Sequence, residues 1–540
     1  MTLLWLALRS HRTGAIATAA IGALSGLLNS VAYVQIAGAT PAERSVFAHS
    51  MEVVGKQLSY ILPPPVQLDT IGGYLTWRAF SAVAIVYAVW AMLAATGAGR
   101  GDEEKGLTEA WLAAGVSRGR WLVTRAAAFV TVAVASIVVA VGASAIGAAV
   151  SNDPLPLGPL AAEVAPLVVL TVWAFGAGLV VAQLTTTRRA ASVIAGLVVV
   201  ALFSLNSLVR AGGDPGVAKW LSPFYVFDRS TPLLAGGAVD WPATAALLAV
   251  GVALIGLAVW AFGRRDIGGA LLRGRPASTG GQRWRPATDP LLRVPVLAHV
   301  DQQRVWIAGW AIAMAVLAYF LASLARTVVD GFKDIPAMQV YLERAGIGGY
   351  GDVIGVIWFS TALLLIAIFV VAQVNAWASD DGDGKLEAVL AAGASRARVV
   401  VERIAALLVA AGIVAAVSSV GVYTASKAFD IPLPADRLIL ATALVLPVVF
   451  ALGAVGHALV GWRPRLAVVL ISAVAVGSYF TLEFVPLFQL PDWVSRTSFF
   501  VLYGTPMTSV DWAGAATLMA IGVLGTASAL VAMQRRDVGR

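Results

Sequence analysis

Two short segments of this sequence carry carboxylates, a serine and arginines in the same order, and their types and spacing suggest a shared chemical role. The first island is EEKGLTEAWLAAGVSR, residues 103–118, and the second island is DGDGKLEAVLAAGASR, residues 381–396. Nine of the sixteen aligned positions are identical, and an arginine follows each island by seven residues, at Arg125 and Arg403. Carboxylates at matched positions suit ion pairing with a basic partner surface. A repeat at a constant offset also predicts two homologous halves.

Other signals of catalysis or metal binding are weak. The chain has no cysteine, which excludes a disulfide and a thiolate metal site, and its four histidines, His11, His49, His299 and His457, are far apart in sequence. No GxxxxGK[ST] phosphate loop occurs. We therefore expect no metal, no cofactor and no nucleotide on this chain. If ATP drives the protein, another subunit must hydrolyse it.

The composition is that of a polytopic membrane protein. Hydrophobic residues make up 59% and charged residues 13% of the 540 residues, and the mean hydropathy is +0.82. Apolar runs of about 20 residues, enough to cross a hydrocarbon core of roughly 30 Å, recur along the chain. The net charge of +8 lies in short segments between these runs, where lysine and arginine determine topology. It therefore does not indicate nucleic-acid binding, and no room remains for a soluble catalytic domain.

Twelve membrane-spanning helices are expected, six in each half. Their expected positions are about 15–36, 75–97, 121–148, 161–184, from Arg189 to 208, 241–262, 305–327, 353–378, 402–427, 437–460, 466–488 and 511–533. An amphipathic entry helix precedes the first span of each half, at the N-terminus and at about residues 297–304. A cleaved signal peptide is the alternative for the N-terminus, but the apolar run there exceeds the roughly 7 to 15 residues of a signal core.

The basic residues predict the domain boundaries and the orientation. The first half is expected at residues 1–262, an arginine- and glycine-rich linker with the second entry helix at 263–304, and the second half at 305–540. Eight arginines lie in the linker, and the chain ends with Arg535, Arg536 and Arg540. Because cytoplasmic loops are rich in lysine and arginine, both termini, the linker and both islands are expected in the cytoplasm. The protein is expected in the cell (plasma) membrane.

Each island is expected to form a short helix along the membrane surface. In the first island one helical stripe is expected to rest on the ends of the spans, and it consists of Leu107, Ala110, Trp111 and Ala114. A charged start is formed by Glu103, Glu104 and Lys105. The residues that point away from the stripe recur in both copies, as Glu109 and Leu112 in the first and Glu387 and Leu390 in the second. A surface for a partner is therefore expected on this outer face.

The ends of the islands carry helix-boundary signals. Gly115 and Gly393 can end the short helix in a left-handed conformation, and Ser117 and Ser395 can cap the next span. The arginines of the islands and those that follow are expected to reach lipid headgroups; they are Arg118, Arg125, Arg396 and Arg403. The alternative interpretation is an amphipathic loop that only anchors the interface. Two matched copies at corresponding points favour a two-fold docking surface.

With these residues placed after the second span of a six-span unit, each half resembles the permease of a type-2 ABC exporter. The doubled, twelve-span chain resembles actinobacterial polyketide-antibiotic (tetronasin-type) and multidrug exporter permeases. The resemblance covers nearly the whole chain, although the family often has proline just before the Ser-Arg pair, where this chain has Val116 and Ala394. It implies an all-α, type V ABC exporter-like membrane fold of two homologous six-helix halves, with entry and coupling helices.

The resemblance also implies partners and site residues. Two copies of a cytoplasmic ABC ATPase subunit would bind ATP and magnesium, and the permease would move hydrophobic or amphiphilic antibiotics, drugs or lipids out of the cell. Residues assigned to ATPase coupling are Glu103, Glu104, Gly106, Glu109, Leu112, Ser117, Arg118, Asp381, Gly384, Glu387, Leu390, Ser395 and Arg396. The second island departs further from the family pattern, which puts equal coupling by the two islands in doubt.

A substrate pathway is expected between the halves, with membrane lipid around it. Its candidate residues are Tyr87, Trp90, Asn206, Trp358, Phe359, Phe369 and Asn375. The alternative for the aromatic residues is packing or an interfacial belt, and Asn375 is favoured to bond between helices. Two other functions stay open. A 6+6 ion-coupled secondary transporter also has repeats, but this chain lacks the charged turn that such transporters carry after span two, and a non-transporting scaffold would not stimulate an ATPase.

Overall fold

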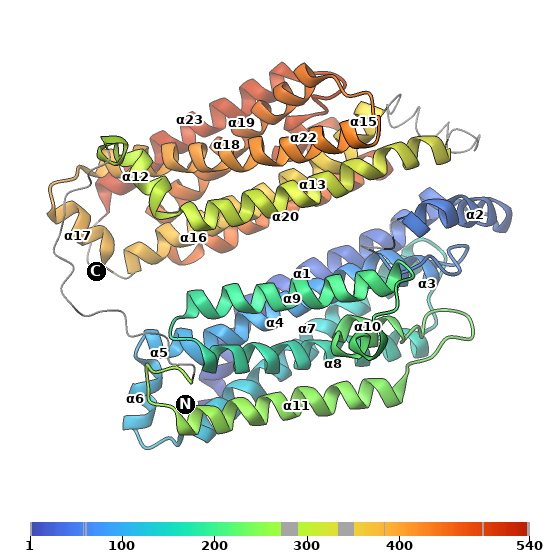
Figure 1. Cartoon of the computed structure of the whole chain (residues 1–540), viewed down its shortest axis with the longest axis horizontal. Helices are drawn as coiled ribbons and strands as arrows, with labels where there is room; N and C mark the ends of the chain where they lie inside the picture. The colour runs from blue at the N-terminus through green and yellow to red at the C-terminus, as the bar shows by residue number, and fades with distance from the viewer. Residues whose placement is uncertain are drawn as a thin grey trace. The chain divides into compact units, whose positions relative to one another are not determined.

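The structure, a computed structural model, describes the chain except for residues 1–2, 58, 60–61, 272–289, 333–349, 383, 489–490 and 537–540. The chain divides into two compact units, Met1–Arg283 and Trp284–Arg540 (Figure 1). Within the described residues there is no β-strand, and an isolated bridge joins Thr505 to Ser509. Twelve helical segments of the described chain are long and apolar enough to cross a membrane. The expected all-α membrane fold is confirmed.

Six spanning segments form the first unit. They are α1 (Leu3–Ala37), the second span Ile71–Glu104, α7 (Arg118–Val150), α8 (Leu157–Leu184), α9 (Arg188–Arg210) and α11 (Trp241–Arg264). The second span is a continuous run of α3 (Ile71–Tyr74), the π-helical turn η2 (Leu75–Phe80), α4 (Ser81–Thr96), a second π-helical turn η3 (Gly97–Gly101) and α5 (Asp102–Glu104). Shorter helices between the spans are α2 (Pro41–Gln57), α6 (Leu107–Ala113), η4 (Gly216–Leu221) and α10 (Pro223–Asp228).

The second unit repeats this order. Its spans are α13 (Arg304–Phe332), the run of α15 (Tyr350–Ile354), the π-helical turn η6 (Gly355–Phe359) and α16 (Ser360–Gly382), then α18 (Arg396–Ala428), α19 (Ala435–Trp462), α20 (Pro464–Phe488) and α23 (Trp512–Arg535). Its shorter helices are η5 (Pro290–Arg293), α12 (Pro295–Gln302), α17 (Lys385–Ala391), α21 (Asp492–Ser495) and α22 (Phe499–Tyr503). The short helix α17 stands where α6 stands in the first unit.

Capping residues set the same helix boundaries in both units. The amide of Arg120 donates to the Ser117 hydroxyl at the start of α7, and both α7 and its counterpart α18 are 33 residues long. Asp240 and Asp511 cap α11 and α23, which both have 24 residues. Because a cap fixes where a helix begins, equal caps and equal lengths show that both units follow one six-span plan.

The entry helices differ between the units. In the second unit α12 is a separate helix that starts with Pro295, as expected, and a break at Gln303 precedes α13. In the first unit the N-terminal entry segment leads without a break into the first span, and both form the single helix α1. The first fourteen residues contain no proline, and their single glycine, Gly14, is tolerated inside a helix. Residues 272–289 of the predicted linker lie outside the described chain.

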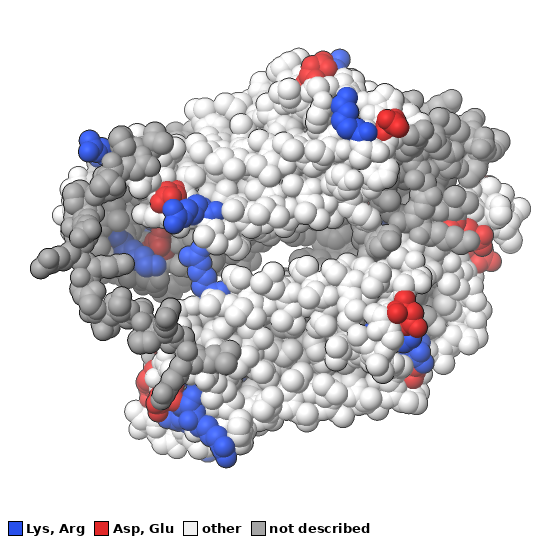
Figure 2. Space-filling model, viewed as in Figure 1, with Lys and Arg blue, Asp and Glu red and all other residues white. Residues whose placement is uncertain are grey.

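Small side chains bring α1 and α7 close together in the first unit. The Ser30 hydroxyl donates to the Ser144 carbonyl at 3.1 Å, and a Cβ atom built on Gly26 would lie 2.2 Å from the Ser144 hydroxyl. Such contacts are the usual basis of helix association in a bilayer. On the visible face of this unit, charged residues lie at the two ends of the helices, and the long surface between them carries none (Figure 2). That distribution suits helices that cross a hydrocarbon layer.

Candidate docking site

The two islands form short helices bounded by glycines with positive φ. Gly106 (φ +67°) precedes α6 and Gly384 (φ +71°) precedes α17, while Gly115 (φ +86°) and Gly393 (φ +89°) follow them. A side chain at these four positions would strain the backbone, which explains why glycine stands there in both copies. The expected glycine ends and the serine caps of the next spans are confirmed.

The inner face of the short helices differs from the predicted stripe. Thr108 and its counterpart Leu386 are buried, whereas Leu107 is 46% exposed. Trp111, which is half-buried, stacks on Trp121 of α7 with ring centroids 6.2 Å apart. Half-buried side chains also include Leu112 and Leu390, whereas Ala110 and Ala114 are exposed. The predicted stripe is therefore rotated by about one residue, or roughly 100° on a helix.

The outer face of both helices presents a carboxylate. Glu109 and Glu387 are exposed, and each lies in the first turn of its helix, where a negative charge is favoured by the helix dipole. The prediction that Leu112 and Leu390 also point outward is wrong for Leu390, which packs against the buried core of its unit, and Leu112 is half-buried. The outward-facing acidic group common to α6 and α17 is thus one glutamate at the same position.

Glu103 is not part of a solvent-facing charged start. It lies at the end of the second span, is 8% exposed, and accepts hydrogen bonds from Arg100 at 2.7 Å and from both terminal nitrogens of Arg265. Arg265 also donates to the Gln183 side chain at 2.7 Å. The two guanidiniums pair with the charge of this carboxylate, which allows it to be buried away from water. Through Arg265 and Gln183, Glu103 connects the second, fourth and sixth spans. Of the predicted charged start, Glu104 and Lys105 are exposed, whereas Glu103 is buried.

Glu104 is exposed, but its side chain accepts a hydrogen bond from another helix. One of its carboxylate oxygens accepts the backbone amide of Arg188 at 2.6 Å, at the first residue of α9. This contact places a negative charge at a helix N-terminus, where it is stabilising. In the second island the helix α16 extends through Asp381, whose side chain lies outside the described residues, as does Asp383. The predicted roles of Glu104 and Asp381 in coupling stay predictions.

An aspartate–arginine pair joins the second and third spans in each unit. Arg125 of α7 forms an ion pair with Asp102 and also donates to the Ser10 hydroxyl. Arg403 of α18 forms the corresponding pair with Asp380 at 3.3 Å. The expectation that these arginines reach lipid headgroups is therefore wrong. Asp102 and Asp380 precede the two islands by one residue, so extending the repeat by one position would have found them.

The arginine at the end of each island joins α7 or α18 to the last span of its unit. Arg118 donates to the carbonyls of Phe262, Gly263 and Arg265, the shortest contact being 2.7 Å. Arg396 donates in the same way to the carbonyls of Met533, Gln534 and Arg536, the shortest contact being 2.6 Å. Carbonyls at a helix C-terminus lack partners within the helix, and a cation satisfies them and their partial negative charge. Here too the expected headgroup contact is replaced by a contact within the protein.

The Glu103 network has no described counterpart in the second unit. At the offset that aligns the islands, Ala378 stands for Arg100 and Gly461 stands for Gln183. Arg536, which follows α23 as Arg265 follows α11, donates to the carbonyl of Val460 at 3.1 Å. The two islands thus share the outward glutamate and the two arginine contacts, whereas Ala378 and Gly461 have no polar side chain to replace Arg100 and Gln183. The side chain of Asp381, which matches Glu103, lies outside the described residues.

The candidate substrate-pathway residues are mostly packed inside their own units. Tyr87 is fully buried, with its hydroxyl 2.7 Å from that of Ser136, and Trp90 is half-buried. The three aromatic candidates of the second unit are also buried; they are Trp358, Phe359 and Phe369. Buried Asn206 donates to Asp228 at 2.7 Å, and Asn375 is exposed. A shared pathway between the halves stays a prediction.

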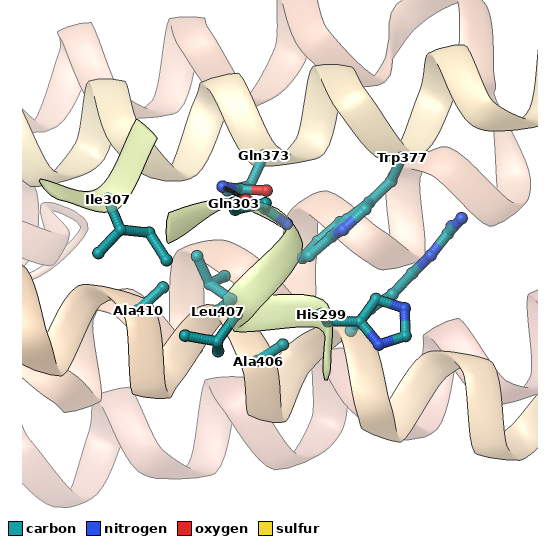
Figure 3. Close-up of a pocket in the computed structure, with 10 residues that line it drawn as sticks. His299, Gln303, Ile307, Gln373, Trp377, Ala406, Leu407 and Ala410 are labelled. Carbon is teal, nitrogen blue, oxygen red and sulfur yellow. Dashed lines mark hydrogen bonds between the residues drawn. The ribbon is translucent and has the colours of Figure 1, made fainter. Parts of the chain in front are cut away.

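A polar pocket beside the Asp380–Arg403 pair is too small for a drug-like molecule. It lies between α12, α16 and α18 of the second unit, where His299, Gln303, Gln373 and Trp377 surround it and Gln373 donates to Gln303 (Figure 3). Its volume is about 20 Å³. That space accommodates about one water molecule, so the pocket does not serve as a substrate site.

Twelve apolar spans in two matching units, each with a short helix tied to the ends of its spans, define a polytopic membrane permease. The chain matches the family model described as multidrug efflux system permease Rv1217c, C-terminal domain, over residues 3–263 and 292–534, and it belongs to this family. Both islands lie within the matched ranges. The chain is also similar to the multidrug efflux system permease protein Rv1217c of Mycobacterium tuberculosis (strain ATCC 25618 / H37Rv), with 25% identity over 415 residues. That alignment covers 74% of this chain and 70% of the relative. The predicted resemblance to multidrug exporter permeases is confirmed.

Proposed function

We propose that this chain is the permease subunit of an ATP-driven ABC exporter, and that separate cytoplasmic ATPase subunits dock on the two islands. The observation that carries this proposal is the pair of matched short helices, each with an exposed glutamate outside and buried contacts to the spans inside. A loop that only anchored the interface would have no reason to repeat an outward carboxylate, Glu109 and Glu387, at the same helical position.

The contacts around the first island support a mechanical role. The helix α6 directly follows the end of the second span at Glu104 and precedes α7, and Arg118 joins α7 to the last residues of α11. A displacement of α6 by a partner would therefore act on three spans at once. Because packed helices move as rigid elements, such a displacement is transmitted rather than absorbed.

Two islands on one chain support a complex of one permease with two ATPase copies. Each ATPase of a symmetric pair needs one docking helix, and this chain supplies both α6 and α17. A mass measurement of the intact complex tests this stoichiometry. One permease chain with two ATPase chains is expected, and two permease chains would contradict the proposal.

The proposed substrates are hydrophobic or amphiphilic compounds that leave the cell. The spans contain few charges, and the similar protein of Mycobacterium tuberculosis is named as a multidrug efflux permease. Apolar and aromatic surfaces bind such molecules broadly and with modest affinity. Proteoliposome transport of a hydrophobic cationic dye and of a small hydrophilic sugar separates the classes, since movement of only the sugar would contradict this assignment.

Reversal of the outward charge tests the docking role. In proteoliposomes that hold the permease and its ATPase, Glu109→Lys is expected to lower the apparent affinity for the ATPase about tenfold, because losing a charge-assisted hydrogen bond costs about 1.5 kcal/mol or more. Substrate-stimulated ATP hydrolysis and export should fall together. Asp266→Lys is the matched control, since Asp266 is also exposed and follows α11 at the same end of the unit (Figure 1). Wild-type ATPase binding by Glu109→Lys would contradict docking at the first island.

A further inference from the structure

A long groove follows the surface of the first unit between the N-terminal part of α1 and the middle of α7. Its volume is about 720 Å³, within the range of ligand sites in proteins. Small side chains form part of the lining, among them Ala15, Ala19 and Ala135, and the larger apolar side chains of Ile16 and Val139 also line it. The groove exists because the small residues that let α1 and α7 approach leave open space beside the contact.

Two arginines line the N-terminal end of this groove. Arg9 and Arg12 are both exposed, and their spacing of three residues places them on one face of α1. Neither forms an ion pair with any described residue, whereas Arg100, Arg125 and Arg265 of the same unit are all paired with carboxylates. The guanidinium of Arg9 lies 5.4 Å from the ring centroid of Trp5, which also lines the groove.

The position of these arginines matches the polar edge of a membrane. The N-terminus of α1 lies at the same end of the unit as α5 and α6 (Figure 1), which is the end expected in the cytoplasm. From Arg12 to Ala19 the helix rises roughly 10 Å into the apolar span. The groove therefore has two cations at a membrane surface and an apolar channel that leads away from them. Its complementary ligand has an anionic head and an apolar chain.

We propose that this groove binds one anionic phospholipid of the cytoplasmic leaflet. Arg9 and Arg12 bind the phosphate, for which the guanidinium fork is well suited, and an acyl chain lies along Ala19 and Val139. Basic pockets between transmembrane helices at the cytoplasmic side are known to suit anionic headgroups. This proposal does not depend on the chain being a transporter.

The described part of the second unit shows no such pair of unpaired arginines at its entry helix. Its entry helix ends next to Arg304, and this arginine is paired with Asp301 at 3.2 Å. A carboxylate beside the cation neutralises the attraction for a phosphate. The expected stoichiometry is therefore one tightly held anionic lipid for each chain, at the first unit.

Native mass spectrometry of the full-length chain tests the site. The protein is released from micelles doped with phosphatidylglycerol or with phosphatidylcholine of the same acyl chains. One retained phosphatidylglycerol and no retained phosphatidylcholine are expected. The double variant Arg9→Gln, Arg12→Gln should weaken phosphatidylglycerol binding about thirtyfold, since each basic residue near an anionic lipid contributes roughly a factor of five.

Two further variants separate the groove from general surface charge. Arg120→Gln removes an exposed arginine at the start of α7 that does not line the groove, and it should leave binding unchanged. Ala135→Phe fills the groove but keeps both arginines, and it should abolish lipid retention. Inorganic phosphate in excess should not displace the lipid, because the acyl chain contributes to binding. Equal retention of phosphatidylcholine, unaltered binding by the double variant, or full displacement by inorganic phosphate would each overturn the proposal.

Discussion

Asp102→Asn is expected to lower the free energy of local opening of the first island far more than Asp380→Asn lowers that of the second. The two aspartates occupy the same position of the repeat, and each pairs with the arginine 23 residues later. Their surroundings differ. The side chains of Asp102 and Arg125 are 11% and 8% exposed. Arg403 is 9% exposed, but its partner Asp380, 3.3 Å away, is 35% exposed, so water reaches this pair from the aspartate side. Asp380 also lies 3.5 Å from Lys385. The same substitution therefore breaks a buried ion pair in one unit and a partly solvated pair in the other.

The difference in exposure between the two pairs determines how much free energy each substitution costs. Removing one member of a buried pair leaves an uncompensated charge and costs about 3–5 kcal/mol. A partly exposed pair at 3.3 Å is screened by water and is worth about 0.2–1 kcal/mol. The free energies of local opening should therefore differ by at least about 2 kcal/mol, which is roughly thirtyfold in the equilibrium constant.

Hydrogen exchange measured by mass spectrometry on the detergent-purified chain resolves the two islands separately. In Asp102→Asn, peptides across α5 and α6 should exchange at least about 150-fold faster than in the unmodified chain, while peptides across α17 stay unchanged. In Asp380→Asn, the increase across α17 should be about fivefold or less. The double variant Asp102→Asn, Arg125→Met should recover part of the protection, because it removes the unpaired cation. Equal acceleration in both single variants would refute the link between burial and island stability.

Three further outcomes are expected. Arg118→Met should reduce ATPase-coupled export while substrate binding, measured by dye fluorescence, persists, and Arg396→Met should act in the same way, because each arginine joins its island to the last span. The isolated chain should not crosslink to a photoreactive ATP analogue, since the sequence has no phosphate loop. The start of α2 should open in acid, below the usual carboxyl pKa of 4.5: hydrogen bonds from Thr40 hold the pKa of Glu43 below that value, so this stabilisation is present above the unfolded pKa and is lost as the pH falls through the folded value. Exchange of the Thr40 amide, corrected for the intrinsic effect of pH, reports this change.

Much of the fold was predictable because a membrane imposes strong constraints on sequence. All twelve spans were expected, since a span needs about 20 apolar residues and little else in this chain has that length. Helix ends were harder. The second span extends to Glu104, seven residues beyond its expected end near 97, because Asp102 and Glu103 are paired with arginines and so can be buried. A hydropathy prediction ends the span before these charged residues. Their burial within the helix follows from their pairing with arginines, which hydropathy does not detect.

The orientation of the island helices was partly predictable. Glu109 was correctly placed outside because it repeats as Glu387. The inner stripe was assigned from the first copy alone, in which Leu107 looks like the best apolar anchor. The second copy has Lys385 at that position and Leu386 at the position of Thr108, so both copies together identify the buried residue. A repeat therefore constrains a helix face more tightly than the hydrophobicity of either copy does.

The two islands are held to their spans by ion pairs of different burial. A difference in coupling between the islands could therefore arise at the spans and not at the docking surface. The sequence predicts weaker coupling by the second island because it departs from the family pattern at Asp381, which would place the difference in docking. The structure shows that Glu109 and Glu387 are both exposed, and that the Asp102–Arg125 pair that holds the first island to the spans is more buried than the Asp380–Arg403 pair of the second. We infer that both islands dock a partner in the same way. We also infer that a displacement of the first island is passed on to the spans more completely, because its buried ion pairs hold it to them.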